Sequence, residues 1–310
     1  MIHEWPIKSK VSRFIKAWRA VNEIREMKIG VIGEPSPWLI YSSGPEVENN
    51  LTNIFDGLRL LRINLRDLYE ELMKESNDKS DDLLEKILDK SKVSKVSKEA
   101  VKTSLMVYHA VSRLLKRYDL DAATIRCFDI IGELDTTACL AASLLNERRA
   151  VLGCEGDLPS LITMILSSKL SDSPTFMANL VWIDGDKFTF AHCTVPLSMV
   201  NRFELDKHYE SGRGVGIRGY FTKGKDVTLV RLDPVSRVIR YATGKMLTSG
   251  TINKQLCRTQ LKIKIPHRKI NDSNIFIRKA IGNHYVIVLR NISEELEYAS
   301  RIIGIESERM

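Results

Sequence analysis

The chain has 310 residues, of which 44% are hydrophobic and 28% are charged, and its formal net charge is +8 at pH 7. This composition is typical of a folded protein with two compact units and excludes intrinsic disorder. No apolar run approaches the roughly 20 residues needed to cross a bilayer, so we expect no membrane partner. The N-terminus also lacks the continuous apolar stretch of a secretory signal.

The cysteine usage indicates a reducing compartment. The five cysteines are odd in number and widely spaced, and no two form a CxxC pair. We therefore expect a cytoplasmic protein. Much of the positive charge lies at the N-terminus and in the run KSKVSKVSKEAVK, without the interleaved aromatic residues that stack on bases. The sequence thus predicts no nucleic-acid partner.

The first part of the chain predicts a leading helix over residues 1–26 and a Rossmann-like α/β domain over 27–172. Apolar runs alternate with amphipathic segments, which is typical of a parallel sheet with crossover helices. The expected strands are 28–33, 57–65, 123–131 and 150–154, and the expected helices are 66–75, 80–88, a long helix capped by Ser97, 135–148 capped by Asp135, and 158–170.

The pattern changes near residue 172, and residues 173–310 predict a second domain. Short apolar runs separated by turn residues indicate an antiparallel, barrel-like β-domain. The expected strands are 175–183, 187–195, 214–222, 226–233, 237–247, 255–265 and 284–289, followed by a terminal helix over 293–304 with Ser293 as its cap.

Three carboxylates follow the expected strands of the α/β domain. Glu155 and Asp157 lie in the turn CEGD after one strand, and Asp129 closes the preceding one. Ligands gather at the carboxyl ends of parallel strands, so we expect these side chains to share a crevice. The alternative is structural: a negative charge at a helix N-terminus is itself favourable by roughly 0.3–1 kcal/mol. Cys154 is expected to serve packing alone.

The β-domain adds three polar interruptions in apolar runs, namely Asn179, His192 and His284. With Glu155 they form a mixed oxygen and nitrogen set that suits Mn²⁺, Co²⁺, Mg²⁺ or Zn²⁺. The alternatives are a core histidine at 192 and a turn residue at 284. The remaining histidines are expected at surface or helix positions: His3, His109, His208 and His267.

Five runs, in order, carry a resemblance to a known family. CEGDLPSLITMIL, FAHCTVP, HYESGRGVGIRG, LCRTQ and IGNHYVIV resemble the L-fucose isomerase and L-arabinose isomerase superfamily, in particular its fucose isomerase-related members. The resemblance implies a site between a sheet domain and a β-barrel domain, a divalent metal, usually Mn²⁺, and aldose–ketose isomerisation of a sugar substrate. It implies that Glu155 is metal ligand and acid/base, and that His284 and His192 are ligands.

The sequence departs from this family in two ways. Asn179 stands where the family has a second acid, and an amide cannot act as a base. Either Asp157 or Asp129 supplies the second group, or the chemistry is different or absent. The resemblance also implies a further α/β domain, which in the family precedes the residues that match here. We expect a homo-oligomer or a partner subunit that carries that domain.

Asp129 is a candidate substrate contact, and so are three further residues. Glu210 and Arg213 lie in the glycine-rich segment ESGRGVGIRG, and Arg258 lies in LCRTQ. Subunit contacts or bracing of the barrel explain them equally well. The sequence thus predicts a divalent-metal-dependent aldose–ketose isomerase with Glu155 and Asp157 as catalytic residues. The alternative function is a non-catalytic or split-subunit homologue that binds a sugar or a partner subunit.

Overall fold

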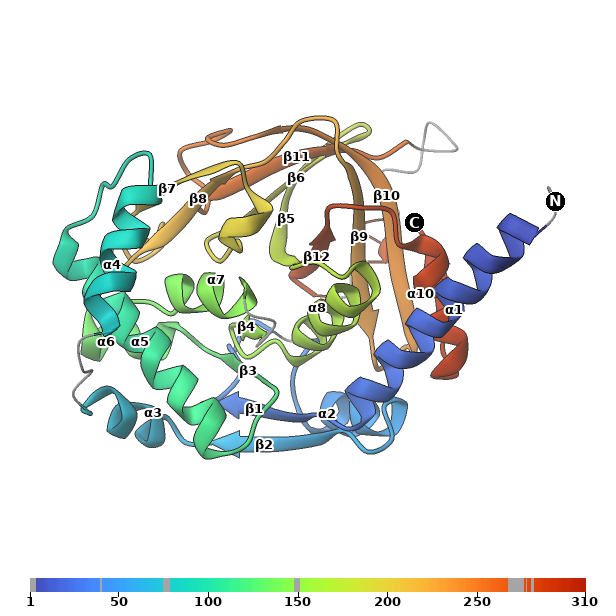
Figure 1. Cartoon of the computed structure of the whole chain (residues 1–310), viewed down its shortest axis with the longest axis horizontal. Coiled ribbons are helices and arrows are strands. Elements are labelled where there is room, and N and C mark those ends of the chain that lie inside the picture. The colour runs from blue at the N-terminus through green and yellow to red at the C-terminus, as the bar shows by residue number, and fades with distance from the viewer. Residues whose placement is uncertain are drawn as a thin grey trace.

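The computed structural model describes residues 4–39, 41–74, 79–147, 151–266, 276, 278–279 and 282–310. Within these residues the fold is α/β, with a parallel sheet of four strands and a closed antiparallel barrel of six strands (Figure 1). The expected parallel sheet followed by a barrel is therefore confirmed. The domain boundary at residue 172 stays a prediction, because the buried apolar residues of both sheets belong to one continuous core.

The parallel sheet has the strand order β2-β1-β3-β4. Because β2 pairs on one side of β1 and β3 on the other, the chain reverses its winding direction between β1 and β3, where α/β sheets bind ligands. The elements of this part are α1 (Glu4–Arg25), β1 (Lys28–Ile32), α2 (Pro45–Ile54), β2 (Arg59–Ile63), α3 (Leu65–Leu72), α4 (Lys79–Lys90), α5 (Lys98–Arg117), β3 (Ala122–Ile125), α6 (Phe128–Leu134), α7 (Cys139–Glu147), β4 (Leu152–Cys154) and α8 (Leu158–Ser171).

The barrel closes because β11 pairs with both β6 and β10, in the order β11-β6-β5-β12-β9-β10. Strand β13 adds to β10 in parallel, and β7 and β8 form a separate two-stranded sheet. The elements of this part are β5 (Phe176–Asp184), β6 (Lys187–His192), the 3₁₀ turn η1 (Leu197–Met199), β7 (Arg202–Asp206), β8 (Gly216–Tyr220), β9 (Asp226–Asp233), β10 (Val238–Ser249), β11 (Thr259–Lys264), β12 (His284–Val288), α10 (Ser293–Ile302) and β13 (Glu306–Arg309).

Helix α8 joins the two sheets. It packs against β4 on one side and against β9 and β12 of the barrel on the other, and Figure 1 shows it between them. Residues 158–167 are all buried, as a helix that is apolar around its whole circumference must be. Asp157 caps its first turn by accepting a hydrogen bond from the Ser160 N–H at 2.9 Å. The carboxyl end of β4 and the first turn of α8 therefore lie directly beneath the barrel.

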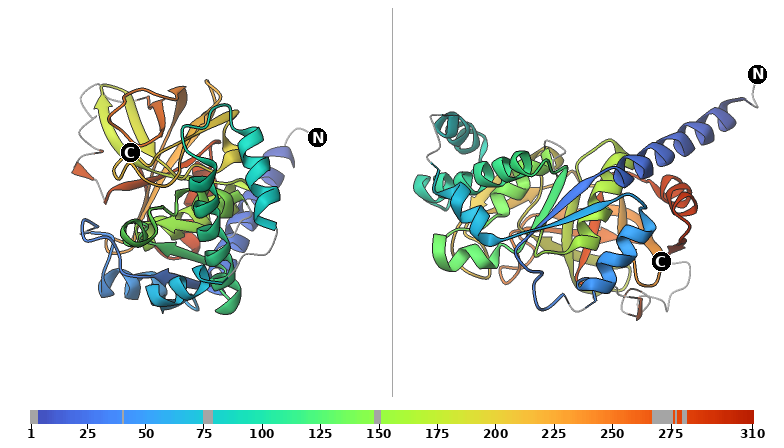
Figure 2. Two further views of the ribbon diagram at one scale, coloured as in Figure 1. Left: turned by 90° about the vertical axis from the view of Figure 1, so that its left-hand side faces the viewer. Right: turned by 90° about the horizontal axis from the view of Figure 1, so that it is seen from below.

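Helix α1 packs on α8 and α10 through one face and extends beyond the body of the molecule at its N-terminal end (Figure 2). Several large apolar side chains of α1 are nevertheless exposed, including Val11 and Trp18. No helix in the described part of the chain combines the length and the apolarity that a membrane span requires.

The structure corrects several expected elements of the α/β part. The strand expected over 123–131 ends at Ile125, and α6 follows, with a pair between Arg126 and Asp129 at its start. Asp135 does not cap the next helix: it ends α6 in the left-handed conformation, with φ 53°, and α7 begins at Cys139. The end of the expected helix at 148, the start of the strand at 150, His3 and His267 lie outside the described residues.

Other elements were missed or assigned a different cap. Helix α2 and strands β7 and β13 were not among the expected elements, although Val47, Leu51 and Ile54 of α2 have the spacing of one helical face. Ser293 is the first residue of α10 and not its cap, because its hydroxyl donates to Asn291. The predicted cap at Ser97 is confirmed, since its side chain accepts from the Ala100 N–H at 3.1 Å.

Candidate active site

Three strand ends of the parallel sheet meet at one cavity of about 510 Å³. The loop after β1 contributes Trp38, the residues after β3 contribute Phe128, and the turn after β4 contributes Glu155. The two aromatic rings contact each other edge to face at 5.1 Å. The barrel and its loops supply the opposite wall, which includes Asn179 and Glu210. The cavity thus lies between the parallel sheet and the barrel, at the place where an open α/β sheet binds ligands.

A tight turn presents Glu155 to this cavity. Glu155 and Gly156 both adopt positive φ, 62° and 73°, a conformation that costs a residue with a side chain roughly 1–2 kcal/mol. The loop after β1 stabilises the turn, because the Ser36 N–H donates to the Glu155 carbonyl at 2.9 Å. A β-carbon at Gly156 would lie 2.6 Å from the Pro35 Cα. The glycine therefore lets the two loops touch.

We expect Gly156→Ala to lower the free energy of unfolding by at least about 2 kcal/mol, because the left-handed backbone and the backbone clash with Pro35 add together. Urea denaturation measures this change. Gly132→Ala is the matched control: Gly132 lies in α6 with no atom within 4 Å of an added β-carbon, so that variant should be neutral or slightly more stable. Equal stabilities of the two variants would contradict the close approach of the loops.

The Glu155 carboxylate is held from two sides. Its Oε2 accepts a hydrogen bond from Trp38 Nε1 at 2.6 Å, and its Oε1 lies 3.5 Å from His284 Nε2. Burial by itself would raise the pKa of Glu155, but His284, His192 and the Trp38 hydrogen bond outweigh burial and lower it. Glu155 is therefore an anion that points into the cavity from a fixed position.

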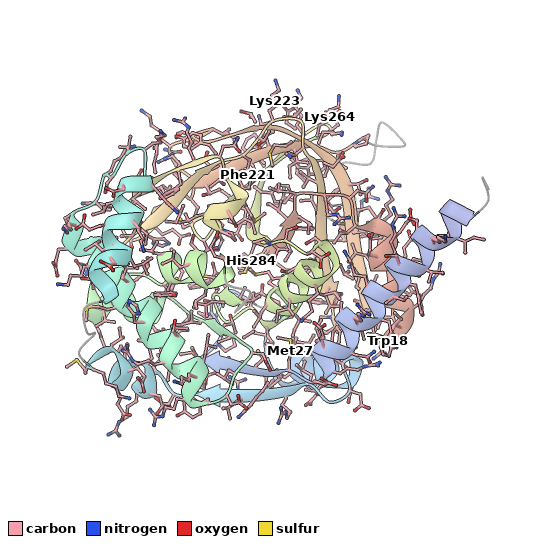
Figure 3. The ribbon with its side chains drawn as sticks, viewed as in Figure 1. Trp18, Met27, Phe221, Lys223, Lys264 and His284 are labelled. Carbon is pink, nitrogen blue, oxygen red and sulfur yellow. The ribbon has the colours of Figure 1, made fainter. Side chains whose placement is uncertain are left out.

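A buried network behind the cavity orients His284. His284 Nδ1 lies 2.9 Å from Asp157 Oδ2, and Arg231 Nη1 lies 3.1 Å from the same oxygen. Arg231 also donates to the His284 carbonyl at 3.0 Å and to the Ser160 hydroxyl. Burial alone would lower the pKa of His284, but the Asp157 hydrogen bond and the neighbouring Glu155 raise it to about 9. Asp157 thus fixes the ring so that Nε2 faces Glu155; Figure 3 labels His284 near the middle of the molecule.

His192 lies beside His284, and the two ring centroids are 5.4 Å apart. Its Nδ1 contacts the Thr194 hydroxyl at 3.0 Å, which leaves Nε2 for another partner. Burial and the neighbouring His284 lower the pKa of His192 to about 4. The ring is therefore neutral at pH 7, the state in which a histidine can bind a metal. His284, whose pKa is raised, would release a proton when a metal binds.

Glu155, His192 and His284 form a buried group whose ligand atoms all lie within 4.8 Å of one another, so this group could hold a metal ion. His284 Nε2 is a buried nitrogen without a hydrogen-bond partner among the described residues. Two nitrogens and a carboxylate oxygen bind a divalent transition metal at about 2.0–2.2 Å. Only a small inward movement would bring all three to that distance, so the residues fit such an ion.

The other predicted site residues fall into two groups. Asn179 and Glu210 line the cavity, and Asn179 is the antiparallel neighbour of His284 across β5 and β12. Asp157 does not reach the cavity: its side chain is fully buried beneath His284, so it cannot touch a substrate there. Asp157 therefore does not make the expected catalytic contact; it orients His284 instead.

Three predicted substrate contacts lie elsewhere. The Asp129 carboxylate accepts a hydrogen bond from Arg126 and lines a separate cavity near β2. Helix α6 turns the Asp129 side chain away from Glu155. Arg213 pairs with Asp135 at 2.9 Å on the surface. Arg258 donates to the Lys207 carbonyl at 2.6 Å and braces the loop after β7. The structure therefore does not bring these three side chains together with Glu155.

Sequence reasoning missed three functional side chains. Trp38 lies outside every expected helix and strand, and only the contact between two strand ends shows its role. Arg231 lies within an apolar strand, where a cation signals a buried carboxylate partner. His208 was expected at the surface, yet its side chain is only 5% exposed and packs edge to face on Phe128.

Comparison with known proteins gives distant relatives of one kind. No protein-family model matches the chain. A protein named sulfoquinovose isomerase from Priestia megaterium is 21% identical over 98% of this chain and 69% of its own length. Proteins of the same name from Alkalicoccus urumqiensis and Clostridium sp. are 23% and 19% identical, over 97% and 96% of this chain and 69% and 68% of their own length. The chain is therefore similar, over nearly its whole length, to proteins named as isomerases of a sugar.

Proposed function

We propose that the chain is a divalent-metal-dependent aldose–ketose isomerase of the fucose/arabinose isomerase type, with Mn²⁺ as its ion. The observation that carries this proposal is the buried group of Glu155, His192 and His284 at the carboxyl end of the parallel sheet. The relatives named sulfoquinovose isomerase support a sugar isomerase. A cytoplasmic location fits the free cysteines, and the homo-oligomer or partner subunit stays a prediction.

The proposed ion would be held by the Glu155 carboxylate, His192 Nε2 and His284 Nε2, with the Asn179 amide oxygen as a further donor. A divalent ion in such a site supplies a Lewis acid that polarises a sugar carbonyl. The chain's own groups prepare the ligands: Asp157 fixes His284, and Trp38 fixes Glu155. Such supporting contacts typically change metal affinity about 10- to 100-fold.

The remaining walls of the cavity suit a small polyhydroxylated molecule. Asn179 and Asn283 offer amide groups that can donate to and accept from hydroxyls. Trp38, Phe128 and Tyr209 offer apolar faces on which the C–H side of a sugar packs. A cavity of about 510 Å³ lies in the range typical of small-molecule sites, about 300–1,000 Å³.

Metal uptake and turnover test the proposal together. Protein stripped with a chelator is expected to bind about one Mn²⁺ per chain in calorimetry, since the residues form one site. The reloaded protein is expected to interconvert at least one of L-fucose, L-arabinose and sulfoquinovose with its ketose. Absence of uptake of Mn²⁺, Co²⁺, Mg²⁺ and Zn²⁺ would contradict the metal site.

The alternative function is a homologue that binds a sugar without converting it. It is favoured by Asn179, an amide that lines the cavity and cannot act as a base. Metal-loaded protein that binds a polyol in calorimetry but interconverts none of the three aldoses would support this alternative. Interconversion by the purified chain would exclude it.

A further inference from the structure

The chemistry of an aldose–ketose isomerase needs more proton carriers than the metal-binding group supplies. A proton leaves C2 and another arrives at C1, while a hydroxyl proton passes from O2 to O1. Glu155 is engaged by Trp38 and His284. Asn179 is an amide, and Asp157 is sealed beneath His284. A proton carrier must therefore be sought elsewhere on the cavity wall.

Within the described part of the chain, the carboxylates that line this cavity are Glu155 and Glu210. Glu210 lies in the loop between β7 and β8, the two-stranded sheet whose β8 packs against β11 of the barrel, while Glu155 follows β4 of the parallel sheet. A sugar bound in the cavity would lie in contact with both walls. We infer that Glu210 is the catalytic residue that carries the proton between C2 and C1, an inference that rests on the proposed function.

The loop around Glu210 is held in place although the side chain itself is 49% exposed. The His208 N–H donates to the Arg213 carbonyl at 3.1 Å, and the Gly212 N–H donates to the His208 carbonyl at 2.9 Å. His208 Nδ1 also contacts the Ser211 hydroxyl at 3.0 Å. Arg258 braces the start of the loop from below. These contacts hold the backbone that carries the Glu210 carboxylate at the cavity wall, and a fixed backbone is what positioned proton transfer needs.

The surroundings of Glu210 suit a group that both accepts and returns a proton. Burial raises the pKa of Glu210 and the charge of Glu155 raises it further, while His208 opposes the rise. His208 Nε2 lies 3.6 Å from Glu210 Oε2. A carboxyl whose pKa moves upward toward neutrality is a better acid/base catalyst than one at its ordinary value.

The step balances without any further reactant. The Glu210 carboxylate takes the C2 hydrogen of the open-chain aldose as a proton, and the C2–H electron pair becomes the C1=C2 double bond. The C1=O1 π pair moves to O1, which ends with the proton that O2 gives up. As O2 gives up its proton, an O2 electron pair forms the C2=O2 bond, and the C1=C2 π pair takes the proton back from Glu210 at C1, which leaves the ketose and a carboxylate. No oxidant or reductant is consumed.

The test compares Glu210→Gln with the wild-type protein, both loaded with Mn²⁺, on the best of the three aldoses in D₂O. We expect turnover and deuterium incorporation at C1 or C2 to fall at least about 100-fold. The Mn²⁺ affinity should stay within about twofold, because Glu210 is not a ligand, and Glu210→Asp should restore part of the exchange. The matched control is Glu85→Gln on α4, since Glu85 has a similarly exposed side chain, 53%, and should keep full activity.

Three outcomes separate the two claims. Loss of exchange in Glu210→Gln with unchanged metal binding supports the inference. If the wild-type protein is active and Glu210→Gln exchanges deuterium within threefold of it, the role of Glu210 is wrong but the proposed function stands. Absence of interconversion and of exchange in the metal-loaded wild-type protein overturns the proposed function, and the role of Glu210 with it.

Discussion

The Glu155→Gln variant is expected to lose more than about a hundredfold in Mn²⁺ affinity and about a thousandfold in kcat/KM, which corresponds to roughly 4 kcal/mol. The substitution keeps the shape of the side chain and removes its negative charge. Groups that merely orient a ligand change metal affinity about 10- to 100-fold, so loss of a charged ligand should exceed that range. Calorimetry with Mn²⁺ and a ketose-formation assay measure the two quantities.

The control for this variant is Glu34→Gln. Glu34 lies in the loop after β1, close to Glu155 in the fold, but its side chain is 76% exposed and pairs with Arg62 on the surface. This variant should bind Mn²⁺ and turn over sugar as the wild type does. If Glu155→Gln instead keeps Mn²⁺ affinity within threefold while remaining folded, Glu155 is not a metal ligand and the proposed site is wrong.

The largest effect on stability is expected for Asp157→Asn. This change should lower the free energy of unfolding by about 3–5 kcal/mol, because it leaves the Arg231 cation buried without its carboxylate. The side chains of Arg231 and Asp157 are 2% and 0% exposed, so water cannot replace the lost partner. Urea denaturation measures the loss. Asp186→Asn, which removes a half-exposed pair with Lys264, should change stability by less than about 0.5 kcal/mol.

The buried Asp157 carboxylate should also make the stability of the folded protein depend on pH. Burial alone would raise the pKa of Asp157, but Arg231, His284 and the Ser160 N–H lower it below its ordinary value. A lowered pKa in the folded state contributes stability that is present above the unfolded pKa, near about 4, and is lost as the pH falls below it. The wild-type protein should therefore lose stability between about pH 4 and 2, and Asp157→Asn should lose less over that interval. If the wild-type protein and Asp157→Asn lose equal stability over that interval, Asp157 is not the group responsible for the acid dependence.

Much of the fold follows from local patterns in the sequence. The alternation of apolar runs and helical periodicity predicted the parallel sheet, and the series of short strands predicted the barrel. The errors lie where local signals compete. FDII reads as a strand, yet it forms α6, whose start carries an i,i+3 pair between Arg126 and Asp129 that fits a helical turn. β13 buries none of its side chains, so apolar alternation could not reveal it. β7 is only five residues long, and its short run was not recognised although Phe203 and Leu205 are buried.

The site residues that could be predicted are polar side chains within otherwise apolar segments. Glu155, His192 and His284 interrupt buried segments, and the structure brings them together. The roles of Trp38 and Arg231 depend on contacts across more than 70 residues of sequence, which no spacing rule captures. For Asp157, a negative charge at a helix N-terminus was predicted. Its contact with His284 could not be, because that contact exists only where β12 lies over the first turn of α8.

The metal-binding group draws its members from both sheets: Glu155 follows β4, whereas His192 and His284 lie on β6 and β12 of the barrel. An ion bound there would tether Glu155 to His284, which lie more than 100 residues apart in the sequence. Such a tether couples occupancy to the resistance of the whole chain to heat, since any ligand that binds only the native state stabilises it by about 2.7 kcal/mol at a concentration 100 times its Kd. Thermal melting in a titration of Mn²⁺ would therefore report occupancy even when no sugar is present.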